Sequence, residues 1–127
     1  MPPKPLLFVV DDDDFIHRFI KFGLKDLPIG KIAHFYSGEE CLKNMHKSPD
    51  IVLIDYEMEG MNGIETIKKI NHPNIRIFMI SGINDKRISE KAIQNGAEDF
   101  FLKDNSLIHK LNAIFSPKDV SSNLDSF

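Results

Sequence analysis

Apolar residues form two alternating patterns along this chain, short runs and periodic stripes. The short runs are continuously or nearly continuously apolar, which is typical of strands covered on both faces. They are Leu6–Val10, Ile51–Ile54 and Ile75–Ile80, with weaker candidates at Lys31–Tyr36 and Asp99–Leu102. The runs predict five β-strands.

The stripes between these runs repeat at the three-to-four spacing of amphipathic helices. The longest follows an Asp-rich segment and contains Phe15, Ile16, Phe19, Ile20, Leu24 and Leu27. Shorter helices are predicted at Glu39–His46, Ile64–Ile70, Asp85–Gln94 and Ser106–Phe115. Strict strand–helix alternation predicts one α/β domain, a doubly wound five-stranded parallel sheet with helices on both faces.

The domain is predicted to span residues 1–115, and the polar segment 116–127 is expected to be a flexible tail because it lacks periodicity. The first strand is followed by aspartates instead of a glycine-rich turn, so the chain has no dinucleotide-binding fingerprint. A formal net charge of −3 without a basic stripe argues against direct nucleic-acid binding.

Cysteine content and hydropathy indicate the compartment. Cys41 is the single cysteine, which excludes an internal disulfide and suits a reducing cytoplasm. Its apolar neighbours predict that it lies in the core. No apolar stretch approaches membrane-spanning length, and the first residues lack the apolar region of a signal peptide, so neither a membrane association nor export is expected.

Polar side chains occupy the carboxyl ends of the predicted strands, where open parallel sheets bind ligands. They are Asp11, Asp12, Asp55, Ser81 and Lys103. Each pair of carboxylates about 4 Å apart would repel by roughly 4 kcal/mol at an effective dielectric constant of about 20. A cation must offset this repulsion, and a site with only oxygen ligands suits Mg²⁺. With the amine and the hydroxyl, the set is equipped for phosphoryl transfer.

Other polar residues are predicted to have structural roles or none. Asp13 and Asp14 are placed to cap the helix that follows them. The histidines are scattered and receive no predicted chemistry; they are His17, His34, His46, His72 and His109.

Four segments carry a resemblance to a known family. They are VVDDD, DIVLIDYEMEGMNG, MISG and GAEDFFLK, in this order along the chain. On these motifs the sequence resembles the receiver domain of two-component response regulators, over about residues 5–115. The resemblance implies a flavodoxin-like fold with strand order 2-1-3-4-5.

The resemblance also implies a role for each residue at the strand ends. Asp55 would be the phosphoacceptor, receiving a phosphoryl group from a histidine kinase or phosphotransferase, and would also be a ligand of the Mg²⁺ ion. Asp12 would bind Mg²⁺ directly, Asp11 mainly through water, and Glu57 through its backbone carbonyl. Lys103 would contact a phosphoryl oxygen.

A switch is implied as well. Ser81 would move towards the phosphoryl group, and Phe100 occupies the family's aromatic switch position. Its rotation would remodel the face formed by the fourth helix, fifth strand and fifth helix, where a downstream protein would bind. Phe101, which points to the opposite side of the strand, is expected in the core.

Three positions depart from the family pattern. Asp104 follows Lys103 where the family commonly has a cis proline; a non-proline cis bond costs ~2.5–4 kcal/mol, so the bond is either trans or enforced by its surroundings. Glu59 replaces a common proline, while Asn62-Gly63 keeps the turn chemistry. Glu57, two residues after the acceptor, is predicted to alter how water reaches an acyl phosphate.

The sequence therefore predicts a phosphorylation-dependent switch and not an enzyme, because the domain would modify only itself and turn over no separate substrate. Three alternatives stay open. The chain could be a receiver cut from a longer regulator, or a receiver-like domain that binds partners without phosphorylation. A Mg²⁺-dependent phosphatase of the haloacid-dehalogenase type is disfavoured, because Phe15 replaces the expected Thr or Val and the chain has no room for a cap domain.

Overall fold

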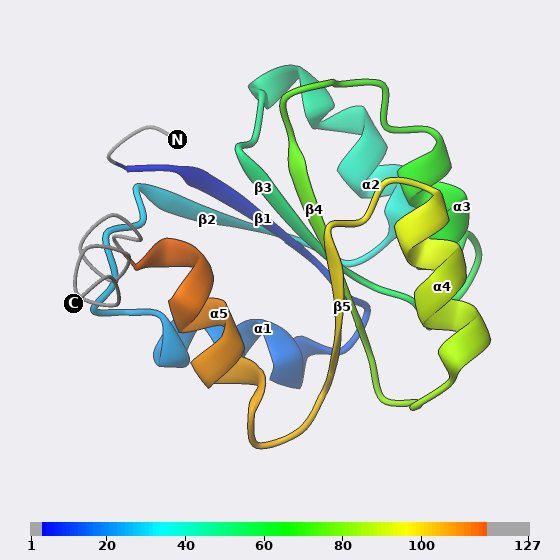
Figure 1. Cartoon of the computed structure of the whole chain (residues 1–127). Coiled ribbons are helices and arrows are strands. Elements are labelled where there is room, and N and C mark those ends of the chain that lie inside the picture. Colours follow the sequence, from blue (N-terminus) through cyan, green and yellow to red (C-terminus); the bar gives the residue numbers. More distant parts are fainter. Residues whose placement is uncertain (1–3, 117–127) are drawn as a thin grey trace, which may run out of the picture.

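The computed structural model describes residues 4–116 and contains a parallel β-sheet between two helical layers (Figure 1). The sheet has five strands in the order β2-β1-β3-β4-β5, which confirms the predicted architecture and strand order. The strands are β1 (Leu6–Val10), β2 (Lys31–Phe35), β3 (Ile51–Asp55), β4 (Arg76–Ser81) and β5 (Asp99–Leu102).

The helices divide between the two faces of the sheet. They are α1 (Asp14–Gly23), α2 (Gly38–Lys43), α3 (Gly63–Lys68), α4 (Lys86–Gln94) and α5 (Leu107–Phe115), with a short 3₁₀ turn η1 (Met45–Lys47) after α2. Helices α1 and α5 cover one face, and α2, α3 and α4 cover the other (Figure 1). Both faces of the central strands are therefore removed from water.

This double covering explains the continuous apolar runs. Neighbouring side chains of a strand point to opposite faces, so Leu7 and Val9 of β1 pack beneath α1 and α5. Phe8 and Val10 pack on the other side, with α2 and α3. All four are buried, with at most 1% of the surface exposed. Cys41 is also fully buried in the second layer, as expected.

The first helix is shorter than its stripe predicts. Helix α1 ends at Gly23, and Leu27 lies beyond it in the connection to β2. A Cβ at Gly23 would overlap the side chain of Ile108 in α5, so the two helices pack closely at this position. At the other end Phe15, which belongs to the same stripe, is 59% exposed and does not join the core.

Every peptide bond in residues 4–116 is trans, so the Lys103–Asp104 bond is trans. Within the same residues, no helix has both the length and the apolar character that crossing a membrane requires. The predicted tail, apart from Ser116, lies outside the described residues.

Candidate functional site

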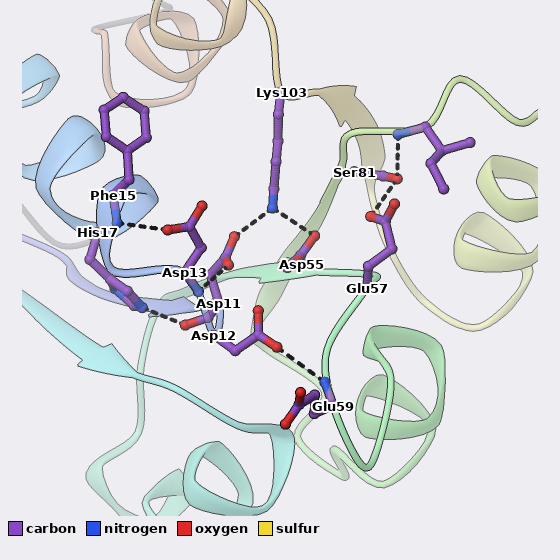
Figure 2. Close-up of polar contacts among 11 residues, drawn as sticks. Asp11, Asp12, Asp13, Phe15, His17, Asp55, Glu57, Glu59, Ser81 and Lys103 are labelled. Carbon is purple, nitrogen blue, oxygen red and sulfur yellow. Dashed lines mark hydrogen bonds and ion pairs between the residues drawn. The ribbon is translucent and has the colours of Figure 1, made fainter.

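The carboxyl ends of four strands bring the expected side chains together (Figure 2). Asp55 is the last residue of β3 and Ser81 the last of β4, while Asp11 follows β1 and Lys103 follows β5. Since β1 pairs with β3 and β4 pairs with both β3 and β5, these four positions share one edge of the sheet. The topology alone thus places an acid from each of the two central strands beside a lysine and a serine.

Lys103 bridges the two buried acids. Its Nζ lies 2.9 Å from Asp11 Oδ2 and 3.1 Å from Asp55 Oδ1. Asp11 and Asp55 are at most 1% exposed, and neither of these two oxygens accepts a hydrogen bond from any other group in the described residues. One ammonium group therefore serves two carboxylates that water does not reach, which leaves the cluster short of positive charge.

The three aspartates fit a divalent cation. Asp11, Asp12 and Asp55 can each offer one oxygen, and these oxygens lie within 4.8 Å of one another. Asp12 is exposed, and its Oδ2 accepts a hydrogen bond from the backbone N of Glu59 at 3.1 Å. Two buried carboxylates and one that faces solvent match the oxygen-rich, partly hydrated site that Mg²⁺ prefers. Coordination by the Glu57 carbonyl stays a prediction.

Burial dominates the ionisation of the cluster. It raises the pKa of Asp55 from 3.8 to about 7, with a further increase from the negative charge of Asp11. Burial also raises the pKa of Asp11. For Lys103 burial opposes the charge, yet the two carboxylates outweigh it and raise the pKa of the ammonium. Without a metal, the site holds its lysine charged and resists full ionisation of both acids.

The run of four aspartates divides between the site and the helix. Asp11 Oδ1 accepts a hydrogen bond from the backbone N of Asp13 at 2.9 Å, which closes the turn after β1. Asp13 then caps α1 by accepting from Phe15 N at 3.0 Å, as predicted. Asp14 lies in the first turn, where its charge favours the helix N-terminus. The first two acids face the site and the last two begin the helix.

A histidine pair supports this turn, and the sequence analysis missed it. His17 is 2% exposed, and its Nε2 lies 2.7 Å from the carbonyl oxygen of Asp11. A carbonyl only accepts, so this nitrogen carries the hydrogen. Nδ1 of His17 lies 2.7 Å from Nδ1 of His34. The pKa of His34 is lowered, mainly by burial and next by the neighbouring His17. The available signal was that His17 shares the apolar stripe of Ile20 and Leu24.

The loop after β3 returns close to Asp55. Asn62 accepts from Glu65 N at 2.9 Å and Glu65 accepts from Asn62 N at 2.9 Å, forming a capping box that starts α3. Gly63 follows, and a Cβ at this position would overlap the backbone carbonyl of Asp55. The expected turn chemistry of Asn62-Gly63 therefore holds the loop against the end of β3.

A Gly63→Ala variant should lower the free energy of unfolding by about 1–3 kcal/mol, because the added methyl group must displace backbone. Urea unfolding measures the change. Gly82→Ala is the matched control, since a Cβ there would meet no atom within 4 Å. Equal stability of the two variants would contradict the close approach of Gly63 to Asp55.

The two expected switch residues, Ser81 and Phe100, are not part of the acidic cluster. The Ser81 hydroxyl donates a hydrogen bond to Oε1 of Glu57 at 2.8 Å (Figure 2). Phe100 is half-buried against the layer of α2, α3 and α4, whereas Phe101 is buried in the opposite layer and stacks on Phe78 with ring centroids 5.8 Å apart. The core position predicted for Phe101 is confirmed, and the switch role of Phe100 stays a prediction.

Comparison with known proteins decides the family. A family model described as the response regulator receiver domain matches residues 7–114. This chain belongs to the response regulator receiver family. The receiver is 33% identical over 100 residues to the chemotaxis protein CheY of Listeria monocytogenes, which covers 76% of this chain and 84% of CheY.

Longer regulators match the same region. The receiver is 30% identical over 112 residues to the response regulator GacA of Pseudomonas viridiflava, covering 85% of this chain but only 52% of GacA. Among solved structures, the receiver domain of a LuxO repressor protein from Vibrio parahaemolyticus superposes with a TM-score of 0.78 at 21% identity, covering 98% of both chains. That likeness concerns the fold.

Within this family, the receiver keeps the acidic cluster and the lysine side by side despite its sequence departures. The trans bond after Lys103 leaves Nζ within ion-pair distance of both acids. Glu59, in place of a common proline, supplies a backbone N–H to Asp12 that a proline would lack. The departure at Glu59 thus adds a hydrogen bond to the proposed metal ligand.

Proposed function

We propose that this receiver is a phosphorylation-dependent signalling switch whose Asp55 accepts a phosphoryl group in the presence of Mg²⁺. The observation that carries the proposal is the buried Asp55 carboxylate, which lies 3.1 Å from Lys103 Nζ and within reach of two further aspartates. The donor is a phosphohistidine of a histidine kinase or phosphotransferase. The donor's N–P bond breaks, an O–P bond to Asp55 forms, and the imidazole nitrogen keeps the electron pair and takes a proton.

The residues of the chain prepare this transfer. Asp55 must be ionised to act as a nucleophile, and burial raises its pKa to about 7 in the metal-free site. Mg²⁺ held by Asp11, Asp12 and Asp55 would supply positive charge that favours the ionised form and neutralises the phosphoryl oxygens. Lys103 is positioned to stabilise one of those oxygens, and Ser81 can donate a hydrogen bond to another.

The output passes through protein contacts in this proposal. The domain modifies only itself and turns over no separate small molecule, so we do not class it as an enzyme. The surface formed by α4, β5 and α5 is proposed to bind the downstream protein, and Ile93 of α4 is 47% exposed. Direct nucleic-acid binding and membrane association are not part of the proposal, and the single buried Cys41 suits the cytoplasm.

The chain spans about half the length of GacA, with 52% covered, and most of CheY, with 84% covered. A stand-alone switch and the receiver of a longer regulator therefore both fit, and both use the same site. The family match does not favour the phosphatase alternative, which is not proposed further.

Incubation with a small acyl phosphate or phosphoramidate donor tests the function. Intact mass should increase by one phosphoryl group when Mg²⁺ is present and should stay unchanged when a chelator replaces it. Hydroxylamine should remove the group, because it cleaves acyl phosphates and not phosphoserine. A phosphoryl group that forms without metal, or that resists hydroxylamine, would contradict the proposed site.

A further inference from the structure

The hydroxyl of Ser81 is fully engaged in the unphosphorylated protein. It donates to Glu57 Oε1 at 2.8 Å and accepts from the backbone N of Ile83 at 3.0 Å. Ser81 has no exposed surface, so water cannot substitute for either partner. A serine hydroxyl has a single hydrogen to donate. Whatever next receives that hydrogen must take it from the carboxylate of Glu57.

We propose that Glu57 is a positioning residue that retains the Ser81 hydroxyl until a phosphoryl group on Asp55 displaces it. The inference rests on the proposed function, because it assigns Ser81 to the phosphoryl group in the modified state. It adds a competitor: the hydroxyl is bound either to Glu57 or to a phosphoryl oxygen. Glu57 therefore sets how strongly the unmodified conformation is favoured.

The surroundings of Glu57 support this role. It comes two residues after Asp55, is half-buried, and none of the ion pairs within residues 4–116 involves its carboxylate. Hydrogen bonds to a charged group are stronger than those between neutral groups. Breaking the hydrogen bond between Ser81 and the Glu57 carboxylate therefore costs free energy. The negative charge of Glu57 also contributes to the raised pKa of Asp55, after burial and Asp11, which shows that the two carboxylates interact.

Two effects of Glu57 on a phosphoryl group must be separated. Its charge repels the incoming dianion, and its hydrogen bond occupies the Ser81 hydroxyl. Only the second effect depends on Ser81, so a double-mutant cycle between Glu57 and Ser81 isolates it. The ligand is beryllofluoride with Mg²⁺, a small mimic of a phosphoryl group on an aspartate, whose affinity can be titrated without turnover.

Glu57→Ala should strengthen beryllofluoride binding about tenfold in the parent background and by no more than about twofold in a Ser81→Ala background. Glu59→Ala removes a charge from the same loop and leaves the hydrogen bond between Ser81 and Glu57 in place, so it controls for a general loss of charge. The electrostatic effect of Glu57 itself is the gain that remains in the Ser81→Ala background. The same gain with and without Ser81, or no gain, would overturn the competition.

A second measurement needs neither metal nor phosphoryl mimic. In the metal-free protein, Glu57→Ala should shift the amide signal of Ile83 and speed its hydrogen exchange, because Ser81 loses the partner that fixes its rotamer. Glu57→Gln keeps an acceptor oxygen and should retain a signal close to that of the parent. An unchanged Ile83 signal in Glu57→Ala would overturn the inference. If beryllofluoride fails to bind the parent while Ile83 responds, the proposed function fails and the Glu57–Ser81 contact stands.

Discussion

An Asp55→Asn variant is expected to accept no phosphoryl group and, without metal, to be more stable than the parent by about 2 kcal/mol at pH 8. The loss of phosphorylation follows because the amide has no nucleophilic carboxylate oxygen. The gain in stability follows because Asp55 is 1% exposed, shares Lys103 with Asp11, and must be ionised at this pH. An amide of the same shape removes that buried charge.

The pH dependence of this gain has a definite sign. Burial raises the pKa of Asp55 in the folded protein from 3.8 to about 7, so the folded state binds the proton more tightly than the unfolded chain. The resulting contribution to stability is fully present below about pH 4 and is lost as the pH rises through about 7. Asp11, whose pKa burial also raises, acts in the same direction.

Chemical unfolding of the metal-free proteins between pH 4 and pH 8 measures the effect. The advantage of Asp55→Asn should be small at pH 4 and should reach its full value near pH 8. Asp26→Asn, which changes an exposed aspartate, is the control for the substitution itself. If the stability difference between Asp55→Asn and the parent does not grow with pH, ionisation of Asp55 does not destabilise the folded protein. Mg²⁺ added at pH 8 should stabilise the parent and have little effect on Asp55→Asn.

Replacing Lys103 with methionine is expected to have the second large effect. The variant leaves two buried carboxylates, Asp11 and Asp55, without their one ammonium partner. Removing one partner of a buried charge cluster costs about 3–5 kcal/mol, so the metal-free variant should be destabilised by that order at pH 8. Phosphorylation by a small donor should slow by about 10²-fold or more, because one electrostatic contact to the transferred group is lost.

Two controls separate charge from packing. Lys68→Met changes an exposed lysine in α3 to a residue of similar helix propensity and should leave both measurements close to the parent. For Lys103→Met the destabilisation should shrink at pH 5, because the raised pKa values of Asp11 and Asp55 allow protonation to relieve the unpaired charge. A loss of stability that is the same at both pH values would point to lost packing of the lysine stem.

Periodicity was sufficient for the architecture because this fold covers both faces of its central strands. The runs at Leu6–Val10 and Asp99–Leu102 match β1 and β5 residue for residue. Helix ends were harder to predict. The stripe that includes Leu27 continues past Gly23, but α1 stops at this residue, where a Cβ would overlap the side chain of Ile108 in α5. Such packing between distant segments leaves no trace in a local pattern.

The acidic cluster could be predicted from the rule that parallel strands end at a common edge. That rule predicts that Asp55 and Lys103, which are far apart in the chain, lie close together, and they form an ion pair. The hydrogen bond from Ser81 to Glu57 could not be predicted, since it depends on a rotamer and on the path of the loop after β3. The pairing of His17 with His34 depends likewise on how α1 lies across β2.

The number of consecutive aspartates after β1 also sets the spacing between the acidic site and the start of α1. Two lie at the site and two at the helix start, so deleting any one of them produces the same shortened sequence and deprives one end of its acid. If the site kept its pair, α1 would begin one residue late and its side chains would rotate by about 100°. Ile16 and Ile20, now buried, would then turn away from the sheet. The length of this run, as well as its charge, is therefore fixed by the geometry on either side.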